Sequence, residues 1–293
     1  MKIFISGVES FVGKNLVSYC LKNSIDYFGI DLNCKDSKNT KCMDINSTEI
    51  FKYIDPDSIV VHLAAISTDK DCKKDLNLSV KTNINGTLNL FHNSIQARCK
   101  KFIFASSEWV YGDINSKEMI NEDYRIDLNK LNSIYAITKF TAENLLRNIS
   151  SDIEVIILRL GIIFSDRIDG NISVLEKLFS EVKQKKIITV ESKKFARRFI
   201  HIDDIISGIL SACRSKEVFN YEIFNLSGKD LITLDQIIKY SAVLFNKDIN
   251  IVENSSNKTT SRNVDNSKAK HKLNWSPKIS FKDGMNILFN KFK

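Results

Sequence analysis

The sequence predicts an α/β fold with a doubly wound parallel sheet and a smaller, mostly C-terminal second domain. From the N-terminus to Leu160, short apolar segments alternate with segments of helical periodicity. This alternation favours a parallel sheet covered by helices on both faces. After Gly161 the alternation weakens, which indicates that the remaining chain builds the smaller domain. The 293 residues are 43% hydrophobic and include 18 Phe, enough for a full core.

Composition limits the classes of function. No apolar run is long enough to span a bilayer, and the N-terminus lacks the long apolar stretch and cleavage site of a secretory signal. The six cysteines are scattered without a CxxC pair, which predicts reduced thiols in a cytoplasmic protein, with neither a disulfide framework nor a metal site. The net charge of +8 is spread along the chain. We therefore expect a solvated basic surface, with no nucleic-acid or membrane partner.

A glycine turn joins the first predicted strand to the first predicted helix. Residues 2–6 are apolar, residues 7–13 read Gly-Val-Glu-Ser-Phe-Val-Gly, and helical periodicity continues to residue 22. This order places free backbone N–H groups where a pyrophosphate can bind. The second strand, residues 27–31, ends in Asp31. Its carboxylate would accept hydrogen bonds from an adenosine ribose and repel a 2′-phosphate, so NAD is predicted rather than NADP.

The next segments extend the predicted cofactor site. A third strand at 41–45 carries Asp44 and Ile45, which could flank an adenine. Residues 58–65 read as a buried strand whose small terminal residues let the backbone approach a cofactor closely, with His62 interpreted as a core histidine. A long helix is predicted from 76 to 97.

Three residues carry the predicted chemistry. A strand at 101–106 delivers Ser107 to the carboxyl edge of the sheet, where doubly wound folds bind ligands. Tyr135 and Lys139 are four residues apart, so they project from one face of the next helix. A nearby ammonium favours phenolate, which predicts a lowered pKa for Tyr135 and a proton acceptor near neutral pH. If Ser107 reaches the same point, a substrate hydroxyl or carbonyl meets two hydrogen-bonding partners and one base.

The rest of the chain divides between the two domains. Residues 154–160 and 222–226 read as sheet strands, with a helix at 172–183 and a short strand at 187–190 between them. The segment 197–204 opens another helix, which Asp203 or Asp204 can cap. The polar run 254–266 predicts a mobile surface loop. We expect a cofactor-binding domain at 1–161 and 198–226, and a substrate-binding domain at 162–197 and 227–293.

Taken together, these motifs resemble the extended short-chain dehydrogenase/reductase family of nucleotide-sugar epimerases, dehydratases and reductases. The resemblance covers nearly the whole chain and implies a Rossmann-like fold, an NAD-dependent enzyme, a nucleoside-diphosphate-sugar substrate and a homodimer. The motifs that carry it are Gly7-x-x-Ser10-Phe11-Val12-Gly13, Asp31, His62-Leu63-Ala64-Ala65, Ser107 before Val110-Tyr111-Gly112, Tyr135-x-x-x-Lys139, Arg197 before Phe199-Ile200-His201-Ile202-Asp203, Asp265-Asn266-Ser267-Lys268-Ala269 and Leu273-Asn274-Trp275-Ser276-Pro277.

Position by position, the resemblance implies Ser107, Tyr135 and Lys139 as the catalytic residues. Tyr135 would take a proton from a sugar hydroxyl that Ser107 also binds, and Lys139 would hold the nicotinamide ribose. The implied substrate-binding residues are Ser107, Glu108, Trp109, Arg197 and Arg262, with both guanidinium groups placed against the nucleotide diphosphate. The expected cofactor-binding residues are Gly7, Ser10, Phe11, Val12, Gly13, Asp31, Asp44, Ile45, Leu63, Ala64, Ala65, Asn83, Tyr135 and Lys139.

Departures from the family pattern leave the sugar and the reaction open. Ser10 replaces the middle glycine of the fingerprint, Arg198 replaces a usual aspartate, and Ile162 replaces an asparagine that often contacts substrate. Trp109 occupies a position where 4,6-dehydratases carry an acid, so dehydration is disfavoured. The first hypothesis is a redox-neutral epimerase. The alternative is a 4-ketosugar reductase, because Ser107-Glu108-Trp109 is similar to the Thr-Asp-Tyr of those enzymes. A cofactor-binding regulator is a third, non-catalytic hypothesis.

Overall fold

A seven-stranded parallel sheet organises the protein in the computed structural model, which describes residues 1–149, 153–167, 173–255 and 260–292. The strand order β12-β7-β5-β4-β1-β2-β3 reverses direction of winding between β1 and β4, where doubly wound sheets bind ligands. This order confirms the predicted fold class. The sheet strands are β1 (Lys2–Ser6), β2 (Asp26–Asp31), β3 (Thr40–Cys42), β4 (Ile59–His62), β5 (Lys101–Ser107), β7 (Glu154–Leu160) and β12 (Tyr221–Leu226).

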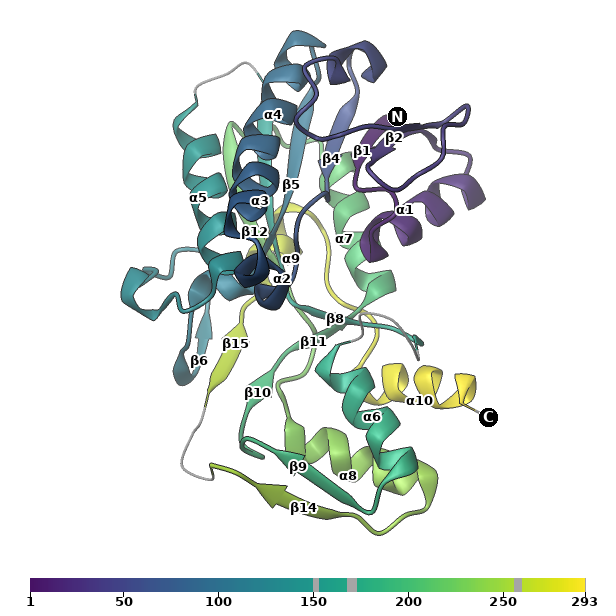
Figure 1. Cartoon of the computed structure of the whole chain (residues 1–293), viewed down its shortest axis with the longest axis vertical. Helices are drawn as coiled ribbons and strands as arrows, with labels where there is room; N and C mark the ends of the chain where they lie inside the picture. Colours follow the sequence, from purple (N-terminus) through teal and green to yellow (C-terminus); the bar gives the residue numbers. More distant parts are fainter. Residues whose placement is uncertain (150–152, 168–172, 256–259, 293) are drawn as a thin grey trace.

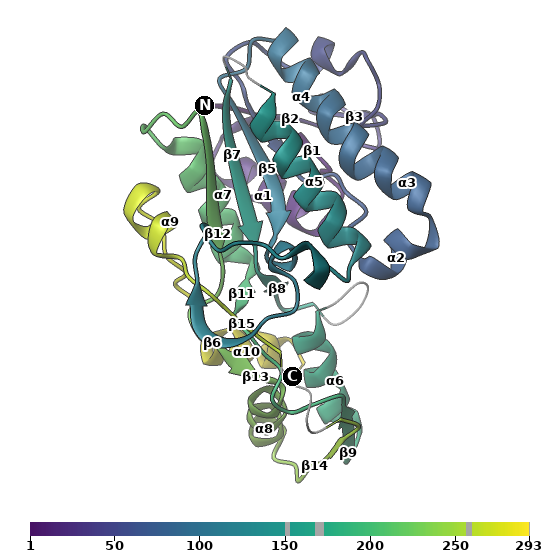
Figure 2. The same cartoon turned by 90° about the vertical axis from the view of Figure 1, so that its left-hand side faces the viewer.

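Helices cover both faces of this sheet (Figures 1 and 2). On one face, α1 packs against α7, and their apolar sides form a core with β1, β4 and β7 that includes Leu16 and Ile205. On the other face, α4 and α5 cover a second core that includes Phe91 and Leu146. The helices around the sheet are α1 (Phe11–Lys22), α2 (Asp69–Lys74), α3 (Leu76–Val80), α4 (Gly86–Gln96), α5 (Ile134–Asn148) and α7 (Ile202–Arg214).

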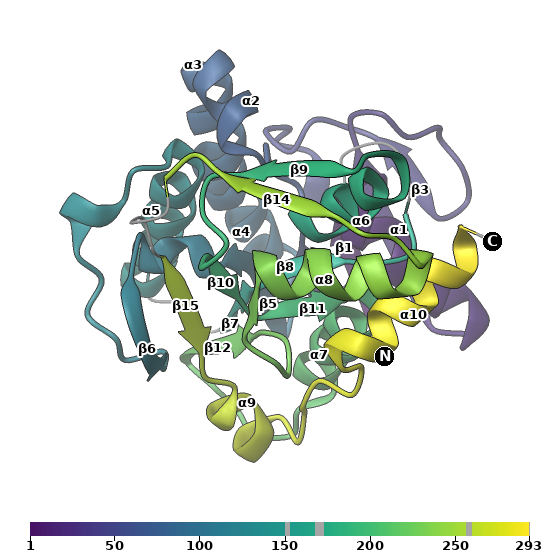
Figure 3. The same cartoon turned by 90° about the horizontal axis from the view of Figure 1, so that it is seen from below.

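The smaller half lies below the carboxyl edge of the sheet (Figures 1 and 3). Its core includes Phe179, Ile237 and Met285, from three helices that pack together. Helix α6 begins with a reciprocal capping box between Ser173 and Glu176. The smaller half and its connections to the sheet comprise α6 (Val174–Gln184), α8 (Leu234–Phe245), α10 (Phe281–Lys291), β6 (Asn115–Ile120), β8 (Ile162–Phe164), β9 (Ile187–Val190), β10 (Ala196–Arg197), β11 (Phe199–His201), β13 (Ile232–Thr233), β14 (Asn250–Glu253) and β15 (Ser261–Val264). Helix α9 (Ser267–Lys272) packs against β12 of the main sheet.

Several predicted boundaries need correction. The helix expected over 76–97 contains a π-helical turn, Lys81–Asn85, between α3 and α4. The third strand ends at Cys42, before the predicted Asp44 and Ile45. Helix α7 begins at Ile202 and is capped by His201, whose side chain accepts the amide of Asp203. Asp203 and Asp204 therefore lie within the first turn and do not cap the helix.

The polar run 254–266 is not simply a loop. Its residues 261–264 form β15, whose side chains are all buried because the strand lies between β10 and β6. Residues 256–259 of that run lie outside the described residues. All six cysteines have free thiols. Within the described ranges, no helix combines the length and the apolar content needed to cross a bilayer.

Candidate active site

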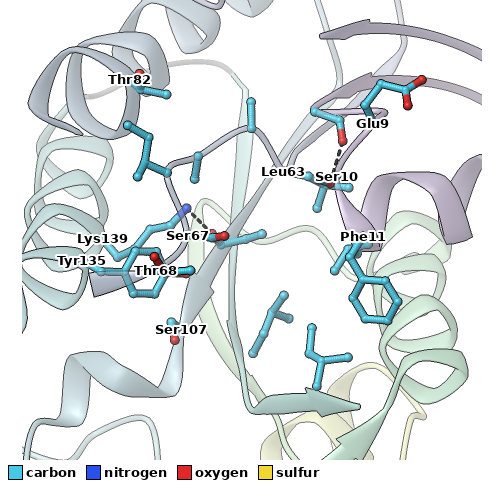
Figure 4. A pocket seen from close by; sticks show the side chains of 18 of the residues that line it. Glu9, Ser10, Phe11, Leu63, Ser67, Thr68, Thr82, Ser107, Tyr135 and Lys139 are labelled. Atoms are coloured by element: carbon cyan, nitrogen blue, oxygen red, sulfur yellow. Dashed lines mark hydrogen bonds between the residues drawn. The ribbon is translucent and has the colours of Figure 1, made fainter. Parts of the chain in front are cut away.

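A cavity of about 840 Å³ opens at the carboxyl edge of the main sheet, between the sheet and the smaller half. It brings the glycine turn and the Ser107–Tyr135–Lys139 group to opposite walls of one space (Figure 4). Its volume is in the range of cofactor and substrate sites. Predicted site residues that line it are Gly7, Ser10, Phe11, Val12, Asp31, Ile45, Leu63, Ala64, Ala65, Ser107, Trp109, Tyr135 and Lys139.

The glycine turn is shaped by two close backbone approaches. Gly7 has a φ of +80°, and a Cβ there would lie 2.6 Å from the amide nitrogen of Ala64. A Cβ on Gly13 would lie 2.1 Å from the carbonyl oxygen of Gly7, so this glycine lets α1 begin directly against the turn. The two glycines therefore leave the first-turn amides of α1 accessible from the cavity. This is the cradle that a dinucleotide pyrophosphate requires.

Ser10, the departure from the family fingerprint, caps α1. Its Oγ accepts the amide of Gly13 at 3.0 Å and donates to the carbonyl oxygen of Gly7 at 2.7 Å. The side chain thus folds into the turn and does not fill the cavity. The cap uses one first-turn amide as a result, while Phe11 and Val12 of the same turn line the cavity.

The acid at the end of β2 also reaches the cavity. Asp31 accepts the amide of Glu9 on Oδ2 and that of Asn33 on Oδ1, both at 3.0 Å. These bonds fix the carboxylate at the position predicted for the adenosine ribose. Asp44 is placed differently: it does not line the cavity, and its Oδ1 accepts the amide of Asn46 at 2.8 Å. Of the predicted adenine pair, only Ile45 lines the cavity.

The predicted catalytic residues meet at the opposite wall. Ser107 ends β5, where its hydroxyl accepts the amide of Trp109 at 3.2 Å, and it lines the same cavity wall as Tyr135. Helix α5 starts one residue before Tyr135 because Ser133 caps it by accepting the amide of Ala136. Lys139 follows one turn later, and its Nζ donates to the carbonyl oxygen of Ala105 at 2.8 Å (Figure 4). The helix spacing and the strand end thus bring the three side chains together as predicted.

The electrostatics of this group differ from the expectation. Burial raises the pKa of Tyr135 to about 12, although the neighbouring Ser107 hydroxyl opposes the rise. Burial also lowers the pKa of Lys139 to about 7, although Glu143 opposes the fall. The expectation of an acidified phenol is therefore wrong for the cofactor-free protein. The lysine Nζ lies 6.0 Å from the Tyr135 ring centroid, and desolvation disfavours both charges.

Asn83 and His62 form buried scaffolding behind the cavity. Asn83 accepts the amide of Ile66 at 2.8 Å and donates to the Thr138 hydroxyl at 3.0 Å, so it ties the loop after β4 to α5. It does not line the cavity. The His62 ring bonds to the Ser6 hydroxyl at 2.6 Å and to Thr87 at 2.9 Å, which confirms its interpretation as a core histidine.

The two predicted diphosphate arginines lie outside this cavity. Arg197 and Arg262 are register partners in β10 and β15. The Arg197 guanidinium donates to Thr260, and Arg262 Nε donates to the Gly112 carbonyl oxygen at 2.8 Å. Arg262 Nη1 lies 3.6 Å from Oε1 of Glu108. Both arginines therefore belong to a neighbouring cluster and have no contact with the main cavity.

Glu108 and Trp109 complete that cluster. The Glu108 side chain is fully buried, its two oxygens have no hydrogen-bond partner among the described residues, and burial raises its pKa. The Trp109 ring lies 5.4 Å from the Arg262 guanidinium carbon and 6.4 Å from the Tyr135 ring. Trp109 lines the main cavity and also a second cavity of about 120 Å³ that includes Arg262. It therefore stands between the reactive group and the arginines.

Some cavity residues were missed at the sequence level. Ser67 and Thr68 continue directly from the predicted Leu63-Ala64-Ala65 run, so extending that run would have found them. Arg167 also lines the cavity, but it is a single arginine in a segment without a motif. Nothing in the local sequence distinguishes it from a surface charge.

A glycine cradle for a pyrophosphate and a Ser/Tyr/Lys group in one cavity define a dinucleotide-dependent enzyme of the short-chain dehydrogenase/reductase class. A family model described as the NAD dependent epimerase/dehydratase family matches residues 3–227. The chain belongs to this family. Both the NAD cofactor and the nucleotide-sugar epimerase interpretation agree with the comparisons.

Individual relatives span more than one reaction. The chain is 27% identical to the UDP-glucuronate 4-epimerase of Thermodesulfobacterium geofontis, covering 98% of this chain and 94% of the relative. It is 25% identical to the dTDP-4-dehydro-6-deoxyglucose reductase of Escherichia coli, covering 99% and 97%. UDP-glucuronic acid decarboxylases of Arabidopsis thaliana are also similar. The structure of the Bacillus cereus UDP-glucuronic acid 4-epimerase with UDP-glucuronic acid and NAD matches with a TM-score of 0.84, at 25% identity, covering 99% of this chain and 98% of that one.

Proposed function

We propose that this enzyme inverts one hydroxyl-bearing carbon of a nucleoside-diphosphate sugar, and that the substrate is a UDP-hexose inverted at C4. One observation carries the proposal. Ser107, Tyr135 and Lys139 line the cavity wall that faces the glycine cradle, so a sugar alcohol and a nicotinamide can meet between the two walls. The choice of UDP as the nucleotide and of C4 as the inverted carbon follows the similarity to the epimerase from Thermodesulfobacterium geofontis and to the Bacillus cereus structure.

The residues have separate tasks in this reaction. When bound, NAD would supply both the hydride acceptor and the hydride donor of the reaction, which would be redox-neutral overall. Tyr135 takes the hydroxyl proton as the carbon is oxidised and returns it when the carbonyl is reduced. Ser107 holds the same oxygen by a hydrogen bond. Lys139, whose Nζ donates to the Ala105 carbonyl oxygen, would hold the nicotinamide ribose.

A ketosugar reductase is the second candidate. It is supported by the Ser107-Glu108-Trp109 sequence and by the similarity to the Escherichia coli reductase. A reductase consumes one NADH for each product molecule, whereas an epimerase consumes none. The decarboxylase relatives define a third outcome, in which UDP-glucuronate would lose its carboxyl group as carbon dioxide.

Product analysis and NADH absorbance, measured on the purified protein, distinguish these three reactions. We expect UDP-glucose or UDP-glucuronate to give a mixture with its C4 epimer, resolved by chromatography and NMR, without net change at the NADH absorbance band. The Tyr135→Phe variant should form product about 10²- to 10⁴-fold more slowly. Stoichiometric NADH consumption with a dTDP-4-keto sugar, or release of a UDP-pentose from UDP-glucuronate, would contradict the epimerase assignment.

We further propose a cytoplasmic homodimer that contributes to polysaccharide biosynthesis, and a division into a cofactor domain (1–161, 198–226) and a substrate domain (162–197, 227–293). The dispersed cysteines support the location of the protein in a reducing compartment. Light scattering on the purified chain would test the dimer directly.

A further inference from the structure

Asp69 is the acidic residue at the reactive end of the main cavity. It is the first residue of α2 and directly follows Thr68, whose side chain caps that helix. Three carboxylates are found among the described residues that line the cavity. Two of them, Glu9 and Asp31, belong to the cofactor wall, where the amide of Glu9 donates to Asp31. Asp69 instead lies on the side of Tyr135, because α2 packs against α5.

The Asp69 carboxylate is ionised at neutral pH. Burial acts to raise the pKa of Asp69, but Lys73, the Ser133 hydroxyl and the Tyr135 amide stabilise the charged form and hold the pKa below its usual value. The Nζ atom of Lys73 lies 2.7 Å from Oδ2 of Asp69, and the lysine side chain is 59% exposed, so solvent screens its charge. The positive N-terminal end of α5 therefore already faces a carboxylate of the protein itself.

Asp69 and Trp109 separate the reactive wall from the buried Arg262. Among the described residues, these two line both the main cavity and the smaller cavity of about 120 Å³ that Arg262 lines. The Trp109 ring lies 5.4 Å from the Arg262 guanidinium carbon. Arg262 also approaches the carboxylates of Glu108 at 3.6 Å and Asp113 at 3.7 Å. The charge of this guanidinium is therefore covered by an aromatic ring and compensated by acids of the protein.

Little positive charge remains for an anionic group on the sugar. Lys139 and Arg167 are the basic residues among the described lining of the main cavity. Arg167 lies at the other end, with its guanidinium carbon 3.4 Å from the centroid of the Phe11 ring. Lys139 Nζ donates to the carbonyl oxygen of Ala105, and burial lowers the pKa of Lys139 to about 7, so the lysine is only partly charged. A sugar carboxylate would thus meet Asp69 without a full opposing charge, whereas a sugar hydroxyl would meet an acceptor.

We propose that the sugar end of the cavity is built for an uncharged hexose, and that Asp69 is the specificity-determining residue that disfavours a carboxylate on the sugar. The inference rests on the proposed function and deepens it by naming the class of sugar. Asp69 repels a uronate by its charge and accepts a hydrogen bond from a neutral sugar. It takes no part in proton or hydride transfer.

Binding measurements on NAD-loaded protein test this inference. The Tyr135→Phe background slows turnover, so calorimetric titrations with UDP-glucose, UDP-glucuronate and UDP report affinity. The two sugars differ by a carboxylate at C6, and UDP reports the nucleotide contacts alone. We expect UDP-glucuronate to bind at least about 10-fold more weakly than UDP-glucose. Asp69→Asn, which removes the charge and keeps the size, should strengthen UDP-glucuronate binding about 5- to 10-fold and leave UDP binding unchanged.

Two further variants separate the charge of Asp69 from general effects. Lys73→Met removes the counter-ion, so UDP-glucuronate should bind a few-fold more weakly still while UDP-glucose is little affected. Asp55→Asn is the matched control, because Asp55 forms an exposed ion pair with Lys2 at 3.3 Å and does not line the cavity. Thermal unfolding of each variant verifies folding. The difference between the two sugars should shrink at high salt, since screening weakens the repulsion.

Two results would overturn the inference. One is UDP-glucuronate binding as tightly as UDP-glucose in the Tyr135→Phe background. The other is a UDP-glucuronate affinity that folded Asp69→Asn leaves unchanged. Product analysis keeps these failures apart from a failure of the proposed function. Preferential epimerisation of UDP-glucuronate by the wild type would retain the proposed function and reject the role of Asp69, whereas the expected affinities without any epimer formed would retain that role and reject the epimerase.

Discussion

A buried ion pair connects the two elements that carry the reactive residues. Glu143 lies one turn beyond Lys139 on α5, and its Oε2 accepts from Arg159 Nη2 on β7 at 2.7 Å. Both side chains are at most 3% exposed. The hydroxyl of Ser106, next to Ser107, donates to the same carboxylate. Glu143 therefore ties the helix that carries the tyrosine to the strand that carries the serine.

Replacing this carboxylate should be costly. Glu143→Gln keeps the size of the side chain, so it opens no cavity, but it leaves the Arg159 charge buried without a counter-ion. Breaking one partner of such a pair costs about 3–5 kcal/mol. The matched control is Glu181→Gln, since Glu181 forms an i,i+4 pair with Lys185 at 3.3 Å on the surface. Such pairs contribute about 0.3–0.5 kcal/mol.

Urea unfolding followed by circular dichroism measures both variants. We expect the free energy of unfolding to fall by several kcal/mol for Glu143→Gln and by less than about 1 kcal/mol for Glu181→Gln. In folded Glu143→Gln, kcat should also fall, because the relative placement of Ser107 and Tyr135 loosens. Equal stabilities for the two variants would refute the reasoning, since they would mean that Arg159 does not need its partner.

Three other predictions concern the cavity. Tyr135→Phe should keep NAD affinity and lose about 10²- to 10⁴-fold in kcat, and unchanged turnover would remove Tyr135 as the base. Gly13→Ala should weaken NAD binding and lower stability by about 1–3 kcal/mol, because its Cβ would lie 2.1 Å from the Gly7 carbonyl oxygen. A variant with wild-type melting temperature and NAD affinity would contradict this. Burial lowers the pKa of Lys139 to about 7, whereas the unfolded value is 10.5, so the unfolded state binds one more proton between these values and stability should rise with pH across that window. Denaturant midpoints at about pH 7 and pH 9.5 should show a smaller rise for Lys139→Met than for the wild type, and equal rises would refute the shift.

The placement of the glycine turn and of Asp31 on the cavity wall was predictable because the signals for it are local. The spacing of Gly7 and Gly13 within one turn, and the position of Asp31 at the next strand end, depend on a short stretch of chain. The backbone geometry of a strand–turn–helix unit then determines where these residues lie. The structure adds the role of Ser10, since nothing in the spacing shows whether its hydroxyl faces the cavity or caps the helix.

The substrate half was less predictable because it depends on contacts between distant segments. Arg197 and Arg262 were expected against a diphosphate, and the structure brings them together in adjacent strands. Their side chains bond to Thr260 and Gly112, however, and neither lines the main cavity. Which way a long side chain turns is decided by the acceptors that the fold places around it. A motif contains no information about them.

The pKa of Tyr135 shows the same limit in energetic terms. Helical spacing places Lys139 one turn from Tyr135, but the lysine attracts a phenolate only when it is charged. Burial lowers the pKa of Lys139 to about 7, so its ammonium form is only partly populated at neutral pH. Desolvation acts on the phenolate as well and raises the pKa of Tyr135 to about 12. An oxidised nicotinamide carries a positive charge of its own. The phenol should therefore become a base near neutral pH only when the cofactor is bound, which couples proton abstraction to the presence of the hydride acceptor.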